Sequence, residues 1–136
     1  MGVTNFDEYR DVFVVADTID DVVHPVTYEL IGQARRIAKE LGQLVQVMLL
    51  GENVQSEAEE LVAHGADIVH VFESPLLKYY TTDGYTKVLT DFFEDHKPNI
   101  LLIGATNNGR DLAPRMSGRM KNGVVADCTI LTVDTE

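Results

Sequence analysis

The sequence has a single cysteine, no tryptophan, and half as many basic as acidic residues. Cys128 stands alone among 136 residues, which excludes an intrachain disulfide and a cysteine-based zinc site. The net charge of −11 disfavours binding to nucleic acid or to an anionic membrane surface. No apolar run approaches the roughly 20 residues of a membrane-spanning helix, and the first residues lack the basic-then-apolar order of a signal peptide. These absences favour one soluble domain in a reducing compartment, the cytoplasm, without nucleic acid or membrane insertion.

Short β-branched runs alternate with helical patterns along the chain. Pro25 suits the first position of a helix, whereas Gly42 and Gly65 suit the residue just after a last turn. The alternation predicts an α/β fold: a doubly wound, mostly parallel sheet in a three-layer αβα arrangement, like that of adenine-nucleotide α-hydrolases. The expected strands are 11–16, 44–50, 68–72 and 100–103, followed by one interrupted or two short strands at 124–126 and 129–133. The expected helices are 25–41, the segment between Gly51 and Gly65, 82–96 and about 111–121.

The topology itself points to one place for a binding site. In doubly wound sheets, ligands bind outside the carboxyl ends of the strands, where the strand order reverses. With the common order 3-2-1-4-5, the first and fourth strands are neighbours at that reversal. The segments beginning at Asp17 and Gly104 are therefore expected to form the two lips of a crevice.

The turn from Gly104 to Gly109 is small and polar, and it leads from a strand into a helix. Backbone amides and the positive end of a helix dipole meet at such a point. One interpretation is a cofactor or nucleotide contact, in which Arg110 points into the crevice. The residues it assigns to cofactor binding are Thr106, Asn107, Asn108, Gly109 and Arg110.

The second interpretation of the same turn is loop geometry alone. Asn108 or Asp111 would then cap the helix, and Pro114 would sit harmlessly in its first turn. Arg115 lies four residues after Asp111 and is expected to form a surface ion pair with it. The turn matches neither a P-loop nor a G-x-G-x-x-G fingerprint, so the motif leaves both interpretations open.

The acidic loop after the first strand invites a metal-site hypothesis. Its residues Asp17, Asp20, Asp21 and His24 lack the spacing of an established metal site. Asp20 or Asp21 is better explained as a cap of the helix that begins at Pro25. The other histidines have no serine or cysteine at a spacing that suggests a catalytic triad, so we expect them to be structural.

The run GATNNGRDLAPRMSGRMKNGVVADCT, residues 104–129, resembles the signature of the α subunit of electron-transfer flavoproteins. The similarity lies in the small-residue turn, the segment GRDLAPR, the following helix and the closing ADC. Upstream, VVAD, the long helix ending in ELG, and HGADIVHVFESP with its tyrosine-rich sequel follow the family's order. The resemblance covers essentially the whole chain.

This resemblance implies the N-terminal scaffold domain of an α/β heterodimer that passes electrons from dehydrogenases through FAD. Such a domain has a Rossmann-like sheet and packs against the β subunit, and FAD is held by the β subunit and by a separate C-terminal domain. That C-terminal domain is absent here, so the chain, 1–136, is expected to be a fragment of a longer subunit, without FAD of its own.

In bifurcating members of the family, a flavin of the β subunit lies near this domain. The resemblance then places residues 106–110 beside that flavin, and Asp111, Arg115 and Asp127 at the subunit contact. The expected role is that of a non-catalytic electron-carrier domain. The alternative is a free-standing adenine-nucleotide-binding domain that uses the same turn for phosphate.

Overall fold

The computed structural model of this chain describes residues 10–96, 98–104, 106–120 and 129–133. Five strands form one parallel sheet in the order β5-β4-β1-β6-β7. The expected strand at 124–126 and the expected helix end at Gly123 lie outside the described residues, whereas the expected strand at 129–133 is present as β7. The bounds of the five strands are β1 Val12–Val15, β4 Val45–Gly51, β5 Ile68–Glu73, β6 Ile100–Gly104 and β7 Thr129–Val133.

The register of the central strands fixes where the site can lie. β1 pairs with β4 on one side, from Val12 opposite Val45, and with β6 on the other, from Val12 opposite Ile100. This arrangement confirms the predicted 3-2-1-4-5 order, because β1 and β6 are the first and fourth strands of the parallel sheet. Their carboxyl ends therefore meet at the point where the strand order reverses.

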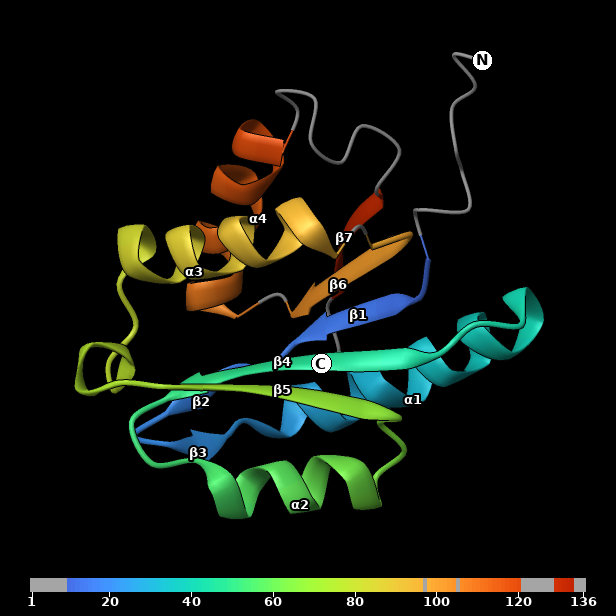
Figure 1. Cartoon of the computed structure of the whole chain (residues 1–136), viewed down its shortest axis with the longest axis horizontal. Helices are drawn as coiled ribbons and strands as arrows, with labels where there is room; N and C mark the ends of the chain where they lie inside the picture. Colours follow the sequence, from blue (N-terminus) through green and yellow to red (C-terminus); the bar gives the residue numbers. More distant parts are fainter. Residues whose placement is uncertain (1–9, 97, 105, 121–128, 134–136) are drawn as a thin grey trace.

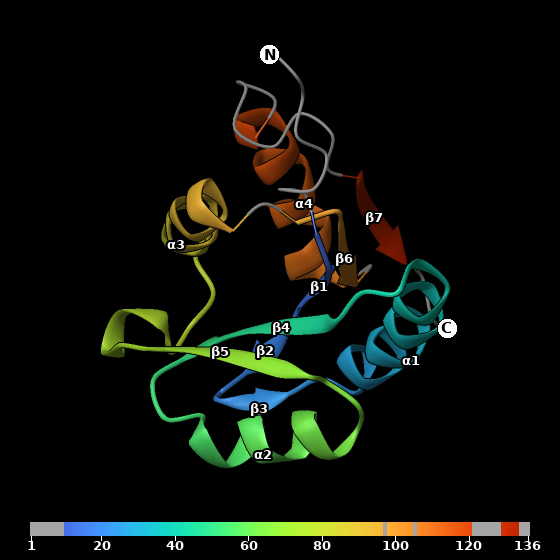
Figure 2. The ribbon, with the colours of Figure 1, turned by 45° about the vertical axis from the view of Figure 1, so that its right-hand side comes forward.

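The helices cover both faces of the sheet in three layers (Figure 1). Helices α1 (Pro25–Leu41) and α2 (Gln55–Ala63) lie on one face, and α3 (Thr82–Asp95) and α4 (Asn107–Met120) lie on the other. Figure 2 shows β7 beside β6, at the opposite side of the sheet from β5. The three-layer αβα prediction is confirmed.

The two faces of β1 supply two separate cores. Val12 and Val14 pack with α1 and α2, whereas Phe13 and Val15 pack with α3 and α4. All four side chains are buried, as expected for a central parallel strand covered on both faces. The sheet is thus a rigid base from which the loops at its carboxyl edge project.

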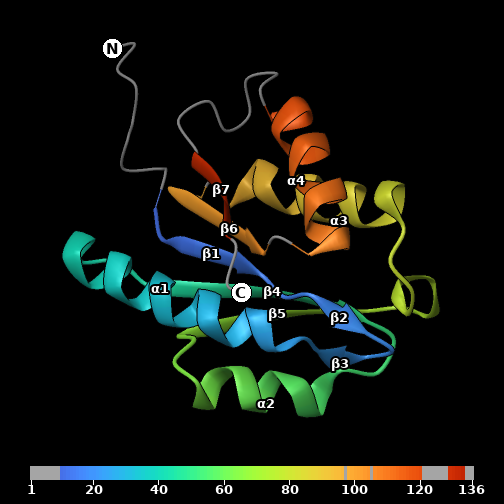
Figure 3. The ribbon, with the colours of Figure 1, turned by 180° about the vertical axis from the view of Figure 1, so that it is seen from behind.

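The segment between β1 and α1 contains a small hairpin, which the sequence analysis treated as a loop. β2 (Thr18–Ile19) and β3 (Val22–Val23) pair antiparallel, and Asp20 and Asp21 form the turn between them, with φ of 51° and 65° respectively. Figure 3 shows the hairpin beyond the carboxyl end of β1. The prediction that Asp20 or Asp21 caps α1 is wrong, since the Nδ1 atom of His24 accepts from the amide of Val26 in that role.

Candidate functional site

Helix α4 begins directly after β6, and Thr106 caps it. The hydroxyl oxygen of Thr106 accepts from the amide of Gly109 at 3.1 Å, and its carbonyl accepts from the amide of Arg110 at 2.8 Å. The helix therefore starts at Asn107, and the predicted start near Asp111, with Asn108 or Asp111 as its cap, is wrong. Taken by themselves, the residue types at 107–110 indicate a turn. They also suit the first turn of a helix, where the backbone N–H groups have no intrahelical acceptor.

The cap of α4 is tied to the end of β1. The hydroxyl of Thr106 donates to a carboxylate oxygen of Asp17, the residue that begins the other lip. The amide of Asp17 donates to the hydroxyl of the buried Thr27 at 3.0 Å, which holds this lip against α1. The prediction that the segments after β1 and β6 face each other is confirmed.

This contact places a negative charge at the positive end of the α4 dipole. A carboxylate there is stabilised by the same field that would attract a phosphate. Asp17 therefore occupies the electrostatic position that the nucleotide interpretation assigned to a phosphate group. A second anion at this point would be repelled by the Asp17 carboxylate.

Gly109 allows α4 to approach β6 closely. A Cβ atom at position 109 would lie 1.8 Å from the carbonyl oxygen of Gly104 and 3.1 Å from the side chain of Ile103. The absence of a side chain at Gly109 thus serves a close approach to the chain's own strand. Gly109 belongs to the first turn of the helix, and the only described glycines with positive φ are Gly42 and Gly65.

The crevice between the two lips is nearly filled by side chains. Its free volume is about 20 Å³, close to that of a single water molecule. Tyr80 and Tyr85 line it from the α3 side, opposite Asp17 and Thr106. Small-molecule sites have volumes of about 300–1,000 Å³, so this crevice does not admit a base or a flavin ring in this conformation.

The outer surface of the β6–α4 lip, residues 106–111, faces solvent. Asn107, Arg110 and Asp111 are exposed, Thr106 and Asn108 are half-buried, and Gly109 is buried. The lip is therefore placed to meet a flat or convex partner from outside, instead of enclosing a ligand.

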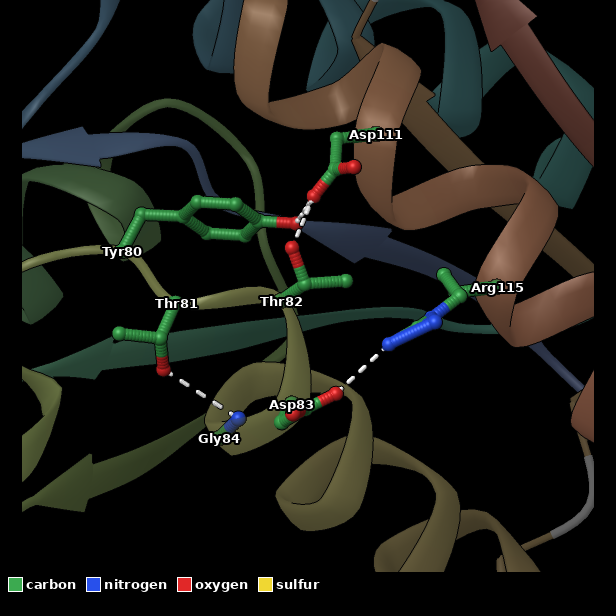
Figure 4. A network of polar contacts seen from close by, with 7 residues as sticks. All are labelled: Tyr80, Thr81, Thr82, Asp83, Gly84, Asp111 and Arg115. Carbon is green, nitrogen blue, oxygen red and sulfur yellow. Dashed lines mark hydrogen bonds and ion pairs between the residues drawn. The ribbon is translucent and has the colours of Figure 1, made fainter.

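A polar network joins the lip to the start of α3 (Figure 4). The phenol of Tyr80 donates to a carboxylate oxygen of Asp111 at 2.7 Å, and the hydroxyl of Thr82 donates to the same oxygen. Burial raises the pKa of Tyr80 to about 12, and the bond to Asp111 adds to the rise. The bonds from Thr82 and Tyr80 hold the pKa of Asp111 below its usual value. Asp111 is thus ionised and fixed in direction at neutral pH.

Arg115 extends this network to a second carboxylate. Its guanidinium contacts an oxygen of Asp83 at 2.6 Å, and both side chains are largely exposed. The predicted surface ion pair with Asp111 is wrong in its partner, because α3 packs beside α4 and brings Asp83 within reach. Thr81 caps α3 through the amide of Gly84, which fixes the position of Asp83 in the first helical turn.

Pro114 lies inside α4, and the expectation that it sits in the first turn is wrong. Because the helix begins at Asn107, Pro114 falls past that turn, and it has no N–H to donate to the carbonyl four residues earlier. The third predicted interface residue, Asp127, lies outside the described residues, as does Cys128.

Three residues of the metal-site hypothesis form hydrogen bonds at three different places in the structure. Asp21 accepts from the amides of Glu52 and Asn53 at 2.9 and 3.2 Å, while Asp17 and His24 serve α4 and α1. Within the part of the chain that the structure describes, no three His, Cys, Asp or Glu side chains are grouped to hold a metal ion. Across the same residues, no helix is both long and apolar enough to cross a bilayer.

Two members of the site, Tyr80 and Thr82, were not predicted from the sequence. A signal was available in the polar residues at the expected start of α3, but it did not indicate which helix they would face. Packing of α3 against α4 supplies that information.

Comparison with known proteins gives a family match over most of the chain. The model of the electron transfer flavoprotein domain matches residues 12–136. The electron transfer flavoprotein subunit alpha of Megasphaera elsdenii is 46% identical over 129 residues, which cover 95% of this chain and 38% of the relative. The LctC subunit of the lactate dehydrogenase (NAD+, ferredoxin) of Acetobacterium woodii is 47% identical, over 90% of this chain and 29% of the relative. The chain thus spans well under half the length of these relatives.

Solved structures resemble the chain in fold. The universal stress protein of Archaeoglobus fulgidus, solved in complex with dAMP, aligns with a TM-score of 0.57 and 15% identity, over 91% of this chain and 97% of that protein. A universal stress protein solved in complex with cAMP aligns with a TM-score of 0.52 and 14% identity, over 94% of this chain and 99% of that protein. These likenesses confirm the predicted α/β architecture of the adenine-nucleotide α-hydrolase type.

Proposed function

The chain belongs to the electron transfer flavoprotein family, and on that basis we propose that it is the scaffold and interface domain of an α subunit. In this proposal, residues 1–136 are the N-terminal part of the subunit. The domain packs on a β subunit and supports electron transfer through FAD. The FAD-binding domain belongs to the remaining length that the relatives have and this chain does not span.

One observation carries the proposal beyond family membership: the β6–α4 lip is exposed although its helix N-terminus is already satisfied. Asp17 holds the hydroxyl of Thr106, and the crevice behind them has a free volume of about 20 Å³. A lip with a filled interior and polar outer side chains is suited to a contact with another subunit. The free-standing nucleotide-binding alternative is not favoured, since it needs an open crevice and an uncompensated helix terminus at this point.

We assign two adjoining roles to the lip. Residues 106–110, with Arg110 as the charged member, face a flavin held by the β subunit, and a positive charge there favours the reduced flavin anion. Asp111 and Arg115, together with Asp127, belong to the subunit contact. FAD is held by the β subunit and by the C-terminal domain, so this chain alone binds none.

The remaining assignments follow from the same proposal. Electrons reach the assembly from flavin dehydrogenases, and the domain itself carries out no catalysis. The single cysteine of the sequence supports a reducing compartment, the cytoplasm.

The proposal is tested on the assembled heterodimer, with the complete α subunit co-purified with its β subunit. Arg110→Ala is compared with Arg10→Ala, an exposed arginine that precedes β1 at the opposite edge of the sheet. We expect Arg110→Ala to lower the midpoint potential of the β-subunit flavin or to weaken subunit association, and Arg10→Ala to change neither. Equal behaviour of the two variants in potential, subunit affinity and electron transfer would remove Arg110 from the site.

A further inference from the structure

A basic groove lies at the amino edge of the sheet, away from the β6–α4 lip. It runs between the C-terminal half of α1 and the end of α2, with Val45 of β4 in its lining, and its free volume is about 650 Å³. Figure 1 shows these two helix ends on the same face of the sheet, at the end opposite the β2–β3 hairpin. The volume falls within the range of about 300–1,000 Å³ that is typical of small-molecule sites.

Three cations line this groove in a chain whose net charge is −11. Arg35, Arg36 and Lys39 project from neighbouring positions of α1, and all three are exposed. Residues three or four apart on a helix lie on one side of it, about 5–6 Å apart at Cβ. The three positive charges therefore arise from positions within about one helical turn.

These cations have no acidic partner within the described residues. None of the three side chains forms an ion pair or a hydrogen bond there. The one carboxylate in the lining is Asp67, which accepts from the amide of Val45 at 2.8 Å. The groove thus combines a single acid, already hydrogen-bonded, with three exposed cations that have no acidic partner among the described residues.

The end of α2 is shaped to accommodate the first of these cations. Gly65 has a φ of +121°, and a Cβ atom at that position would lie 2.3 Å from Cδ of Arg35. The absence of a side chain at Gly65 lets Arg35 lie across the end of α2. The negative ends of the helix dipoles stabilise two of these cations, because Arg35 lies at the end of α2 and Lys39 lies in the last turn of α1. Arg36 has neither relationship, so the helix dipoles do not account for it.

We propose that this groove binds a small oligophosphate, such as the di- or triphosphate group of a nucleotide. Guanidinium groups match phosphate oxygens in bidentate geometry, and an ammonium group adds a point charge. A chain of two or three phosphates carries several negative charges and enough oxygens to meet all three cations at once, in a groove of about 650 Å³. The lining contains no aromatic side chain to stack on a base, so the phosphates and not the base are recognised.

The test is titration calorimetry of the purified chain with inorganic triphosphate at low ionic strength. Arg36→Gln/Lys39→Gln is compared with Lys87→Gln, which removes an exposed cation from α3 on the other face of the sheet. We expect saturable binding that weakens about tenfold or more in the double variant and changes less than about twofold in the control. Thermal unfolding of the variants checks that these exposed substitutions leave the fold intact.

Two results would overturn the proposal. One is the absence of saturable binding by the wild-type chain, or equal weakening in the double variant and the Lys87→Gln control. The other is tighter binding of a glutamate-rich peptide than of triphosphate, which would assign the groove to an acidic protein segment. Both results leave the proposed role of the β6–α4 lip untouched, because the groove and the lip lie at opposite edges of the sheet.

Discussion

The hydroxyl of Thr106 donates to the carboxylate of Asp17, a residue 89 positions earlier in the sequence. The contact joins the cap of α4 to the end of β1, the two points where the strand order reverses. Thr106 also accepts from the amide of Gly109, so one hydroxyl both caps a helix and closes the crevice. The polar groups of Asp17 and Thr106 in the crevice are therefore hydrogen-bonded within the chain itself.

Replacing Thr106 by alanine tests how much this double role contributes to stability. We expect Thr106→Ala to lower the free energy of unfolding by about 1–2 kcal/mol, because it removes a cap and leaves Asp17 without its donor. Thr81→Ala is the matched control, since Thr81 caps α3 through Gly84 and has no carboxylate partner in the structure. Urea denaturation measures both. Equal losses in the two variants would mean that the Asp17 contact adds nothing.

Two glycines of α4 give opposite predictions for the same substitution. Gly109→Ala should destabilise the chain by about 3 kcal/mol, because its Cβ would lie 1.8 Å from the carbonyl oxygen of Gly104 and the helix would have to move. Gly118→Ala should stabilise it by about 0.5–1 kcal/mol, because a Cβ there meets nothing within 4 Å. Denaturation midpoints of the two variants are compared with wild type. A neutral Gly109→Ala would show that α4 does not need this close approach to β6.

The architecture was predictable because its determinants are local or topological. Buried β-branched runs such as Val12–Val15 identify parallel strands, and Gly42 and Gly65 identify helix ends. The handedness rule for parallel crossovers then leaves few strand orders, of which 3-2-1-4-5 is a common one. The observed sheet follows from these rules without knowledge of any single contact.

The β2–β3 hairpin was not predictable by the same means. Its strands have two residues each, too few for a period to be recognised, and Asp20 and Asp21 replace the glycine or asparagine that usually marks such a turn. The carboxylate of Asp21 accepts from the amides of Glu52 and Asn53, 31 and 32 positions later. Long-range contacts of this kind fix a turn that local propensity does not indicate.

The position of the site was predictable, whereas its internal pairing was not. The switch-point rule brought Asp17 and Thr106 to one place, as observed. The i, i+4 rule proposed Asp111 as the partner of Arg115, but the packing of α3 beside α4 offered Asp83 instead. A rule that considers one helix at a time cannot choose between partners on two helices.

Tyr80 should titrate well above a free tyrosine. Its pKa is about 12 because burial and the bond to Asp111 both disfavour the phenolate. The unfolded chain loses this proton near pH 10, so Tyr80 contributes stability that is present below pH 10 and is lost as the pH rises through about 12. The ultraviolet titration difference between wild type and Tyr80→Phe isolates this group. Asp111→Ala removes both the acceptor and the negative charge and should shift the transition to lower pH, and an unchanged transition would exclude Asp111 as a cause.

The pKa of His70 should be lowered, in contrast to that of Tyr80, so His70 should affect stability on the acid side of neutrality. Burial lowers its pKa below the ordinary 6.5, and the nearby His96 lowers it further. The unfolded chain takes up the proton first as the pH falls, so the stability that neutral His70 contributes is present above about pH 6.5 and is lost below it. NMR titration of the imidazole protons measures the shift. Removing the second imidazole with His96→Ala should raise the pKa of His70, and a pKa at or above 6.5 in wild type would contradict the assignment.

Variants of Arg115 and Asp83 can distinguish a structural ion pair from a subunit contact. Its contact with Asp83 is short, at 2.6 Å, but both side chains are largely exposed, and exposed pairs contribute only about 0.2–1 kcal/mol. A double-mutant cycle with Arg115→Ala and Asp83→Ala should therefore give a coupling free energy below about 1 kcal/mol, which decreases at high salt. The cycle is measured by urea denaturation of the isolated chain.

The same two variants are then measured for binding of the β subunit, and the comparison separates the roles. If Arg115 only braces α3 against α4, both variants weaken association equally and slightly, because each removes the same brace. If Arg115 contacts the partner directly, Arg115→Ala weakens association by about tenfold or more, since a truncated charge at an interface leaves its partner group unpaired. Asp83→Ala frees the guanidinium and should then preserve or strengthen association. We expect the second pattern, and equal small effects of the two variants would remove Arg115 from the subunit contact.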